Sequence, residues 1–544
     1  MVGESYLSIV RPCVPESGES SRILRVLSEL ACYSSPRPLS IRYSLNTPFH
    51  TFLNMGQSSQ FNVILVISDT FRHDLLFGKF EVKDGVKART PNLDKLARSS
   101  TVFTKAYHAS FPTVPHRHDL MAGKYTFTYS DWEPLPRGEL VVQEILRKAG
   151  YTTMMIADTP HILKDGFHYD RGFNGWVWIR GQENDRYRTD PVEVQLPCSP
   201  EKLRNVETTV QHMRNNALRR FEEDWIPAKT ATEVVRWLEK NYSRRFFLYV
   251  DFFDPHEPWD PPRWYVDMYD PGYEGEEVTY PVYGPCDYLS REELAHCRAM
   301  YAGEATLVDK WIGRILEKVE ELGLLENTAI IFTSDHGFYL GEHGLIGKSI
   351  IMGEHHGFAP LYEEVTHVPL LVRLPDSLGR GVSKVDELVQ PPDITATILD
   401  LAGVDYRAYT QGSSLLPLLR GEKVEWRDFA ISTPSLIKGA RGGLRPTITT
   451  KRWALILAPT ETPPLEEVEY TMVVDGVPRV LKPFGKVTTE LYDLERDPRQ
   501  EKDVLEENVE VARELRDKFV KFLRELGVSN EIIKPWLKCK RIDS

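Results

Sequence analysis

The feature that most constrains the fold of this 544-residue chain is a short apolar run that ends in polar residues. Residues 63–67 read Val-Ile-Leu-Val-Ile and are followed by Ser68 and Asp69. Such a run predicts a strand buried on both faces, as in a parallel sheet. Comparable runs lie at 153–157, 246–250, 328–333 and 368–372, with helical patterns between them such as 140–149 and 302–322. This alternation predicts an α/β fold, a doubly wound and mostly parallel sheet flanked by helices.

The alternating pattern does not extend over the whole chain. Residues 1–58 are rich in Ser, Pro and Arg and sustain no apolar period, which indicates a poorly ordered N-terminal extension or a misassigned start, with Met55 as the alternative first residue. Residues 59–430 hold the predicted sheet. Residues 431–544 contain shorter apolar runs and a final amphipathic segment at 505–526, which predict a small α+β domain.

Composition excludes several classes of function. The formal charge is −12 and no long Lys/Arg cluster occurs, so we expect no nucleic-acid partner and no binding to anionic membranes. The six cysteines show no zinc-ribbon or disulfide pattern. Without a long apolar run or a secretory signal, the expected location is cytoplasmic. The oligomeric state stays open, and a homo-oligomer is one alternative.

Ionisable residues follow three of the predicted strands. They are Asp69 after the first strand, Asp251, Asp254 and His256 after the run at 246–250, and Asp335 and His336 after the run at 328–333. Any one Asp here could simply cap the next helix. Ligands of open α/β sheets bind at the carboxyl ends of the strands, however, so we expect the three groups to converge. Two carboxylates and one imidazole, from Asp69, Asp335 and His336, suit a divalent cation.

A hydroxyl could complete this set. Thr113 stands in the segment Thr-Val-Pro-His-Arg at 113–117, just before a predicted helix at 118–123. A metal ion, a helix N-terminus and the neighbouring Arg117 would all favour the alkoxide over the alcohol, which would make Thr113 a nucleophile. The alternative is an ordinary threonine that caps the helix.

Several segments, in this order along the chain, resemble the sulfatase family of the alkaline phosphatase superfamily. They are 62–69 with Asp74, Thr-Pro-Asn-Leu-Asp-Lys-Leu-Ala at 90–97, Asp-Pro-His-Glu-Pro at 254–258, Thr-Ser-Asp-His-Gly at 333–337 with Gly-Glu-His-Gly at 341–344 and Lys348, 362–364 with Val-Pro-Leu at 368–370, 393–403, 412–415, and Leu-Tyr-Asp-Leu-Glu-Arg-Asp-Pro at 491–498. The resemblance spans roughly residues 60 to 505. It implies an alkaline phosphatase-like fold in which 59–430 is the catalytic domain.

The resemblance also implies roles for individual residues. Asp69, Asp335 and His336 would bind the metal together with the residue at 113, which would be the nucleophile. Arg117 would steady that nucleophile, and His256 and Lys348 would contact the anionic group that is cleaved. Cationic donors on several sides suit the charge that develops on such a group.

The residue at 113 departs from the family pattern. Sulfatases carry Cys or Ser at the first position of C-x-P-x-R and oxidise it to formylglycine, whereas this chain has Thr113 with Pro115 and Arg117 in register. Threonine cannot become that aldehyde, so its ester must be attacked by water. Phosphoryl transfer by in-line displacement is therefore favoured, as in the phosphonate monoester hydrolases and phosphodiesterases that this arrangement resembles.

Two further departures concern the cations of the site. Thr70 replaces a second aspartate and His336 stands where calcium-dependent sulfatases often have Asn, which favours Mn²⁺ or Zn²⁺ over Mg²⁺ or Ca²⁺. The family's Gly-Lys-x-His segment is replaced by Ala-Asp-Thr-Pro-His at 157–161, so a lysine is missing. His161 is kept as a candidate for substrate contact.

The number of metal ions is a separate question. Two-metal phosphoryl enzymes need a further set of ligands, for which the candidates are Asp254, His343, His355 and His356. Lys348 favours a single ion, because a lysine and a histidine occupy the space of the second ion in one-metal sites of the family.

The favoured function is cleavage of phosphate monoesters or diesters, or of phosphonate esters, through Thr113, with a small anionic ester as the substrate. The alternatives are a true sulfatase that works without formylglycine, a phosphoryl-group transferase, and a protein that only binds an anion. We expect selectivity to depend on the loops at 167–192 and 260–288, which are rich in Trp and Tyr.

Overall fold

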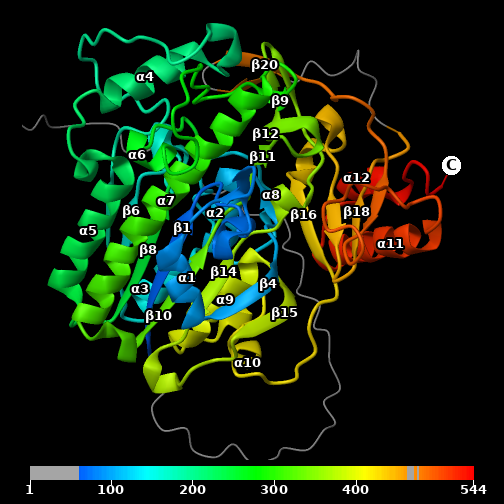
Figure 1. Cartoon of the computed structure of the whole chain (residues 1–544). Helices are drawn as coiled ribbons and strands as arrows, with labels where there is room; N and C mark the ends of the chain where they lie inside the picture. Colours follow the sequence, from blue (N-terminus) through cyan, green and yellow to red (C-terminus); the bar gives the residue numbers. More distant parts are fainter. Residues whose placement is uncertain (1–59, 462–470, 475–476, 544) are drawn as a thin grey trace, which may run out of the picture. The chain divides into compact units, whose positions relative to one another are not determined.

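The computed structural model describes residues 60–461, 471–474 and 477–543 (Figure 1). The predicted N-terminal extension at 1–58 lies outside the described residues. Among the residues that are described, no helix is both long and apolar enough to cross a membrane.

An eight-stranded, mostly parallel sheet forms the centre of the fold, as the apolar runs predict. Its order is β15 (Lys384–Val389), β4 (Thr101–Ala106), β14 (Leu370–Arg373), β10 (Thr328–Thr333), β1 (Asn62–Ser68), β8 (Phe246–Phe252), β6 (Thr152–Ala157) and β7 (Gly175–Trp178). The strand β1 lies between β10 and β8 and is parallel to both. Every residue of β1 is buried, in agreement with its unbroken apolar sequence.

One predicted strand has the opposite direction. The run at 368–372 forms β14, which is antiparallel to both of its neighbours, β10 and β4. Thr333 at the end of β10 pairs with Leu370 at the start of β14. The intervening chain therefore stays at the carboxyl edge of the sheet and enters β14 from that edge. A parallel entry would need a crossover back to the other edge.

Helices cover both faces of the sheet. Side chains of β1 alternate between two cores, with Ile64 and Val66 on one face and the odd-numbered positions 63, 65 and 67 on the other. The first face packs against residues of α5 (Ile226–Asn241) and α7 (Arg291–Glu321). The second packs against residues of α2 (Thr113–Ala122), α3 (Val142–Lys148) and α9 (Pro391–Leu401).

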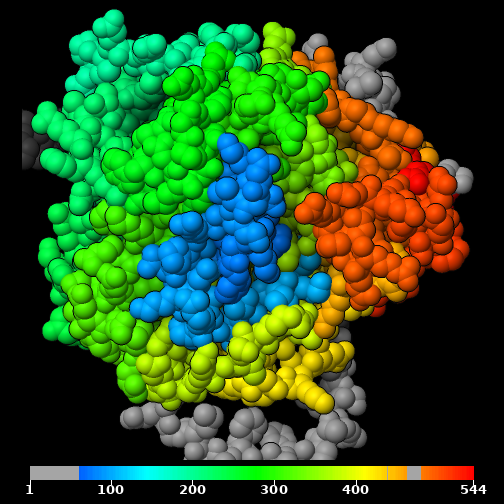
Figure 2. Space-filling model, viewed as in Figure 1, coloured from blue at the N-terminus to red at the C-terminus, as the bar shows by residue number. Residues whose placement is uncertain are grey.

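A five-stranded sheet joins the C-terminal part of the chain to the main part. Its order is β21 (Glu490–Asp493), β18 (Trp453–Ile456), β17 (Thr447–Thr449), β16 (Ala430–Pro434) and β5 (Ser110–Phe111). The helix α11 (Val509–Glu525) packs against it with a strongly amphipathic sequence. In Figure 2 this C-terminal part appears as the orange and red surface gathered on one side. The domain boundary at residue 430 stays a prediction, since β5 and β16 pair across it.

A six-stranded sheet supplies a wall of the cavity described below. It contains β11 (Tyr339–Leu340), β12 (Leu345–Met352), β13 (His355–Gly357), β20 (Val477–Leu481) and β19 (Thr471–Val474), with β9 (Tyr283–Pro285) paired to β12. Three of these strands lie between β10 and β14 in the sequence. The chain therefore builds this wall while it remains at the carboxyl edge of the main sheet.

We expect Phe332→Ala to destabilise the molecule, because Phe332 is fully buried in β10 and its ring packs edge-on against Phe71 at 5.3 Å. Truncating such a core ring costs about 3–5 kcal/mol, which urea unfolding followed by circular dichroism would measure. Leu218→Ala, at a position that is 63% exposed, is the matched control and should change little. A loss below about 1 kcal/mol at Phe332 would contradict this packing.

Candidate active site

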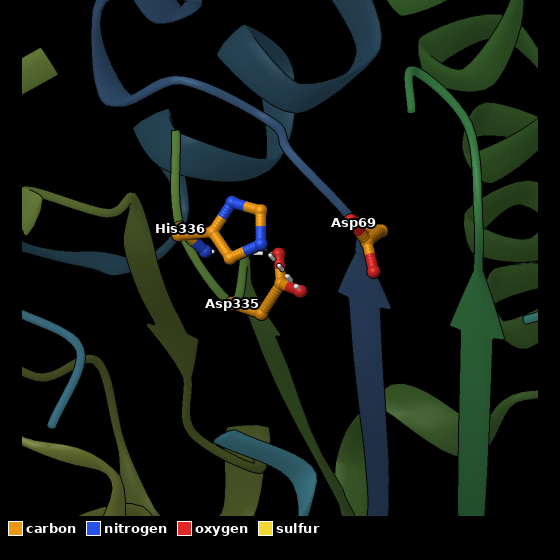
Figure 3. Close-up of side chains that lie close together, drawn as sticks. All are labelled: Asp69, Asp335 and His336. Carbon is orange, nitrogen blue, oxygen red and sulfur yellow. Dashed lines mark hydrogen bonds and ion pairs between the residues drawn. The ribbon is translucent and has the colours of Figure 1, made fainter. Parts of the chain in front are cut away.

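Two adjacent strands bring the predicted metal-binding residues together. Ile67 and Thr333 are register partners on β1 and β10, so the residues that follow them leave the sheet side by side. One ligand atom from each of Asp69, Asp335 and His336 lies within 4.8 Å of the other two. Figure 3 shows Asp69 at the tip of β1 and the other two on the segment after β10. All three side chains are completely buried.

Backbone and side-chain hydrogen bonds orient the carboxylates. Asp335 Oδ1 accepts hydrogen bonds from the amides of Thr70 and His336, both at 2.9 Å. The Thr70 hydroxyl donates to Asp69 Oδ1 at 2.7 Å. The residue that replaces the family's second aspartate therefore positions the two carboxylates that remain.

The imidazole of His336 is oriented in the same way. Its Nδ1 lies 3.0 Å from the carbonyl oxygen of Gly337, a geometry in which Nδ1 donates its proton. The nitrogen Nε2 then carries the lone pair, and it lies 3.4 Å from Asp335 Oδ2 and 3.3 Å from Lys348 Nζ. A backbone carbonyl on the second nitrogen is the usual arrangement for a metal-binding histidine.

The electrostatics of the cluster suit a divalent cation. Burial and the neighbouring Asp335 carboxylate raise the pKa of Asp69 well above its ordinary value. Burial would also raise the pKa of Asp335, but the Arg117 guanidinium together with His336, His116 and Lys348 outweighs it and holds that pKa well below the usual range. Two buried carboxylates beside a neutral imidazole nitrogen form a donor set that fits a divalent metal ion chemically.

Arg117 ties this cluster to the helix α2. Its Nη1 lies 3.0 Å from Asp69 Oδ2 and also contacts Asp335 Oδ2. The same Nη1 donates to the carbonyl oxygen of Thr113 at 3.3 Å, one turn earlier in the helix. Thr113 is the first residue of α2 and is fully buried, and its Oγ1 has no hydrogen-bond partner among the described residues.

A further carboxylate holds Arg117 from the other side. Asp251, near the end of β8, accepts from Arg117 Nη2 at 2.8 Å and from Nε at 3.1 Å. Asp251 is fully buried and also accepts from the hydroxyls of Thr159 and Tyr249. The sequence placed Asp251 at a strand end but gave it no role. Asp251 lies on β8, which is next to β1 in the sheet order. That adjacency is the signal that could have paired Asp251 with Arg117.

The remaining predicted residues border a cavity of about 1070 Å³. Thr113, His161, His256 and Lys348 all line it. His256 stacks on Phe253 with ring centroids 4.1 Å apart, and its Nδ1 lies 2.6 Å from the carbonyl oxygen of Glu257. Burial and the nearby Lys348 hold the pKa of His256 well below its ordinary value, so its ring is neutral.

His161 lies close to His256, with ring centroids 6.4 Å apart. Its Nε2 is 2.9 Å from a carboxylate oxygen of Glu183, a residue that the sequence did not single out. Glu183 belongs to the loop in which we expected selectivity, at 167–192. No motif marks it, because its closeness to His161 arises only from folding.

The candidate ligands for a second metal are not brought together. Asp254 accepts from the Gln182 side chain at 2.8 Å, and His343 lies 3.3 Å from Glu364. His355 contacts the carbonyl oxygen of Lys482, whereas His356 lines the cavity. Within 60–461, 471–474 and 477–543, the only group of three or more metal-binding side chains is that of Asp69, Asp335 and His336.

Sequence relatives of this chain include sulfatases and a related multifunctional hydrolase. An arylsulfatase of Clostridium perfringens is 27% identical over 423 residues, covering 68% of this chain and 80% of that protein. The multifunctional alkaline phosphatase superfamily protein PehA of Trinickia caryophylli is 25% identical over 426 residues, covering 67% of this chain and 78% of that protein.

Solved structures with the same fold include two phosphonate monoester hydrolases. The enzyme of Agrobacterium radiobacter superposes with a TM-score of 0.62 at 20% identity, over 86% of this chain and 96% of that one. The enzyme SpPMH of Silicibacter pomeroyi superposes with a TM-score of 0.59 at 19% identity, over 87% and 97%. At these identities the likeness concerns the fold alone.

The family model described as Sulfatase matches residues 61–404, which is more than half of the chain. This segment includes Asp69, Arg117, Asp335 and His336, the residues that form the buried cluster. The chain therefore belongs to the sulfatase family, within the alkaline phosphatase superfamily, and it is an ester hydrolase.

Proposed function

We propose that this hydrolase cleaves phosphate or phosphonate esters through Thr113. The observation that carries the proposal is the Thr113 hydroxyl, which is buried in the first turn of α2 and borders the cavity without a hydrogen-bond partner among the described residues. A buried hydroxyl normally has a partner. A hydroxyl without one, beside a cationic residue and a cluster of metal ligands, is placed to act on a ligand.

The side chain of threonine decides between phosphoryl and sulfuryl chemistry. Formylglycine releases sulfate because its hydrate collapses to the aldehyde, a route that is closed to Thr113. The threonine ester must instead be attacked by water, which is the ordinary second step of phosphoryl transfer.

The reaction then has two displacements. Thr113 Oγ1 attacks phosphorus, a bond from Oγ1 to phosphorus forms, and the bond to the leaving oxygen breaks in line with it. The Thr113 hydroxyl gives up its proton in this step, and the leaving alkoxide takes up one proton, so the charges balance. A water molecule next attacks the threonine ester, phosphate or phosphonate is released, and the hydroxyl is restored. Lys348 and His256 line the cavity and would stabilise the anionic oxygens, whereas Arg117 contacts the Thr113 backbone and would steady the nucleophile.

Sulfatase-family enzymes are metal-dependent. We propose that Asp69, Asp335, His336 and the Thr113 hydroxyl hold one divalent ion here, with Mn²⁺ or Zn²⁺ favoured by the imidazole in the set. The ion would supply positive charge that favours the ionised hydroxyl and balances the anionic ester. A single ion agrees with Lys348, whose Nζ lies 3.3 Å from His336 Nε2.

A second candidate function is cleavage of sulfate esters by unmodified threonine. It is favoured by the similarity to the arylsulfatase of Clostridium perfringens. The phosphoryl proposal is preferred because Thr113 cannot form the aldehyde through which formylglycine releases sulfate. Transfer to another hydroxyl in place of water stays a third prediction.

We expect Thr113→Ala to lower kcat by about 10⁴-fold or more, because the nucleophile is removed. Thr113→Ser keeps a hydroxyl and should retain measurable turnover. The measurement is a panel of aryl phosphate monoester, phosphodiester, phosphonate and sulfate substrates, with metal content determined for each variant. Sulfate as the best substrate would overturn the phosphoryl assignment. A Thr113→Ala variant with full metal content and full activity would overturn the assignment of Thr113 as the nucleophile.

We expect Asp335→Asn to lose bound metal and activity together, because one of the two carboxylates of the site is neutralised. Elemental analysis of the purified protein measures the first effect, and chelation followed by addition of Mn²⁺, Zn²⁺, Mg²⁺ or Ca²⁺ tests which ion restores turnover. The control is Asp405→Asn, which neutralises an exposed carboxylate distant in sequence from Asp335. Full activity after complete chelation, or restoration by Ca²⁺ alone, would contradict the proposed ion.

A further inference from the structure

A buried set of charged residues lies along one side of the cavity. Glu183 and Glu257 are both completely buried, and Arg204 donates one hydrogen bond of 2.8 Å to each of them. Tyr280 also donates to Glu183 at 2.8 Å, and Tyr283 donates to Glu257. The Arg204 guanidinium stacks over both tyrosine rings, with centroid distances of 4.0 and 4.4 Å. These contacts hold the two carboxylates in fixed positions.

The carboxylate of Glu183 is directed to His161 by this arrangement. Its Oε1 accepts from Arg204 and Tyr280, and its Oε2 lies 2.9 Å from His161 Nε2. The backbone of Glu183 has a φ of 46°, in the left-handed region that non-glycine residues rarely adopt, and its amide nitrogen lies 3.0 Å from His212 Nδ1. Such conformations cost free energy and persist where surrounding contacts impose them.

The two carboxylates of this set depend on few basic partners. Two carboxylates, Glu183 and Glu257, share the single guanidinium of Arg204. Burial would raise the pKa of Glu183, but His161 and Arg204 outweigh it and hold that pKa well below its usual range. An ionised carboxylate buried this deeply requires a cationic partner. Besides Arg204, His161 is a basic side chain in contact with Glu183, with 2.9 Å between its Nε2 and Glu183 Oε2.

The cation matters because this region lacks one that the sequence led us to expect. The segment 157–161 carries no lysine, and His161 is its only basic residue. The neighbouring His256 is neutral and so adds no charge. Within this segment, positive charge therefore depends on the protonation of His161, although Arg204 and Lys348 also line the cavity.

We propose that Glu183 is a positioning residue that keeps His161 protonated, so that the His161 imidazolium serves as the cation for the anionic group of the substrate in place of the missing lysine. This inference rests on the proposed hydrolysis of an anionic ester. It assigns a role to a residue that contacts no reacting atom and acts only through His161.

Other charged and aromatic groups also surround His161. His256 faces it at 6.4 Å, and the rings of Trp132 and Phe253 pack edge-on at 5.1 and 5.5 Å. Lys164 on the same loop and Asp131 beside Trp132 line the same cavity.

The decisive variant is Glu183→Gln, which keeps the size of the side chain and removes its charge. In the wild-type enzyme we expect the cation to persist through neutral pH. In the variant it should be lost as the pH rises through the ordinary histidine value of about 6.5. With the best substrate of the panel, kcat/KM of the variant should be near that of the wild type at low pH and fall about 10- to 100-fold below it at pH 8, mainly through KM.

A permanent cation provides the rescue. His161→Lys should make kcat/KM insensitive to Glu183→Gln above neutral pH, because lysine stays charged without a carboxylate partner. Glu193→Gln is the matched control, since Glu193 is exposed on the same loop and should leave the pH profile unchanged. Thermal unfolding of each variant separates a folding defect from a catalytic one.

The outcomes are distinct. If the wild type cleaves no phosphate or phosphonate ester, the proposed function fails, whatever the variants do. If the wild type does cleave the ester but Glu183→Gln has the wild-type KM at every pH, the role of Glu183 is wrong. A loss that is equal at all pH values and is not rescued by His161→Lys would show a structural role only, and would also overturn the inference.

Discussion

The buried guanidinium of Arg117 is the interaction on which the rest of the site depends. It contacts the carboxylates of Asp69, Asp251 and Asp335, and all four side chains are completely buried. Three carboxylates around one guanidinium leave an excess of negative charge in a region without solvent. Burial of such charge is costly unless it is compensated. A divalent cation at Asp69, Asp335 and His336 would supply that compensation, and metal binding would then be coupled to the integrity of the core.

The order of strands makes this interaction available. The three carboxylates come from the ends of β1, β8 and β10, which are adjacent in the sheet although they are far apart in the sequence. The helix α2 packs on the face of the sheet formed by residues 63, 65 and 67 of β1, and it carries both Thr113 and Arg117. One helical turn separates these two residues, so the guanidinium that joins the carboxylates also touches the backbone of Thr113, the proposed nucleophile. The site is therefore assembled by rigid elements, which keeps its geometry fixed.

The cavity wall places two histidines in different surroundings. Burial and Lys348 favour a neutral ring at His256, although Glu257 Oε2 lies 3.4 Å from its Nδ1. His161, with its ring 6.4 Å away, has a buried carboxylate beside it. Environments that shift the pKa values of two groups in opposite directions are typical of enzyme sites. One position can then carry charge while the other accepts or donates a hydrogen bond.

The sequence by itself determined the α/β class, four of the five marked strands with their direction, and the residues at the strand ends, because buried strands require unbroken apolar runs and ligands collect where such strands stop. It also supplied Thr113 and Arg117 through their spacing. Tertiary structure alone decided the direction of β14, the pairing of Arg117 with Asp251, and the placement of Glu183 beside His161. Each of these depends on contacts between residues distant in sequence, for which neither periodicity nor a local motif gives a signal.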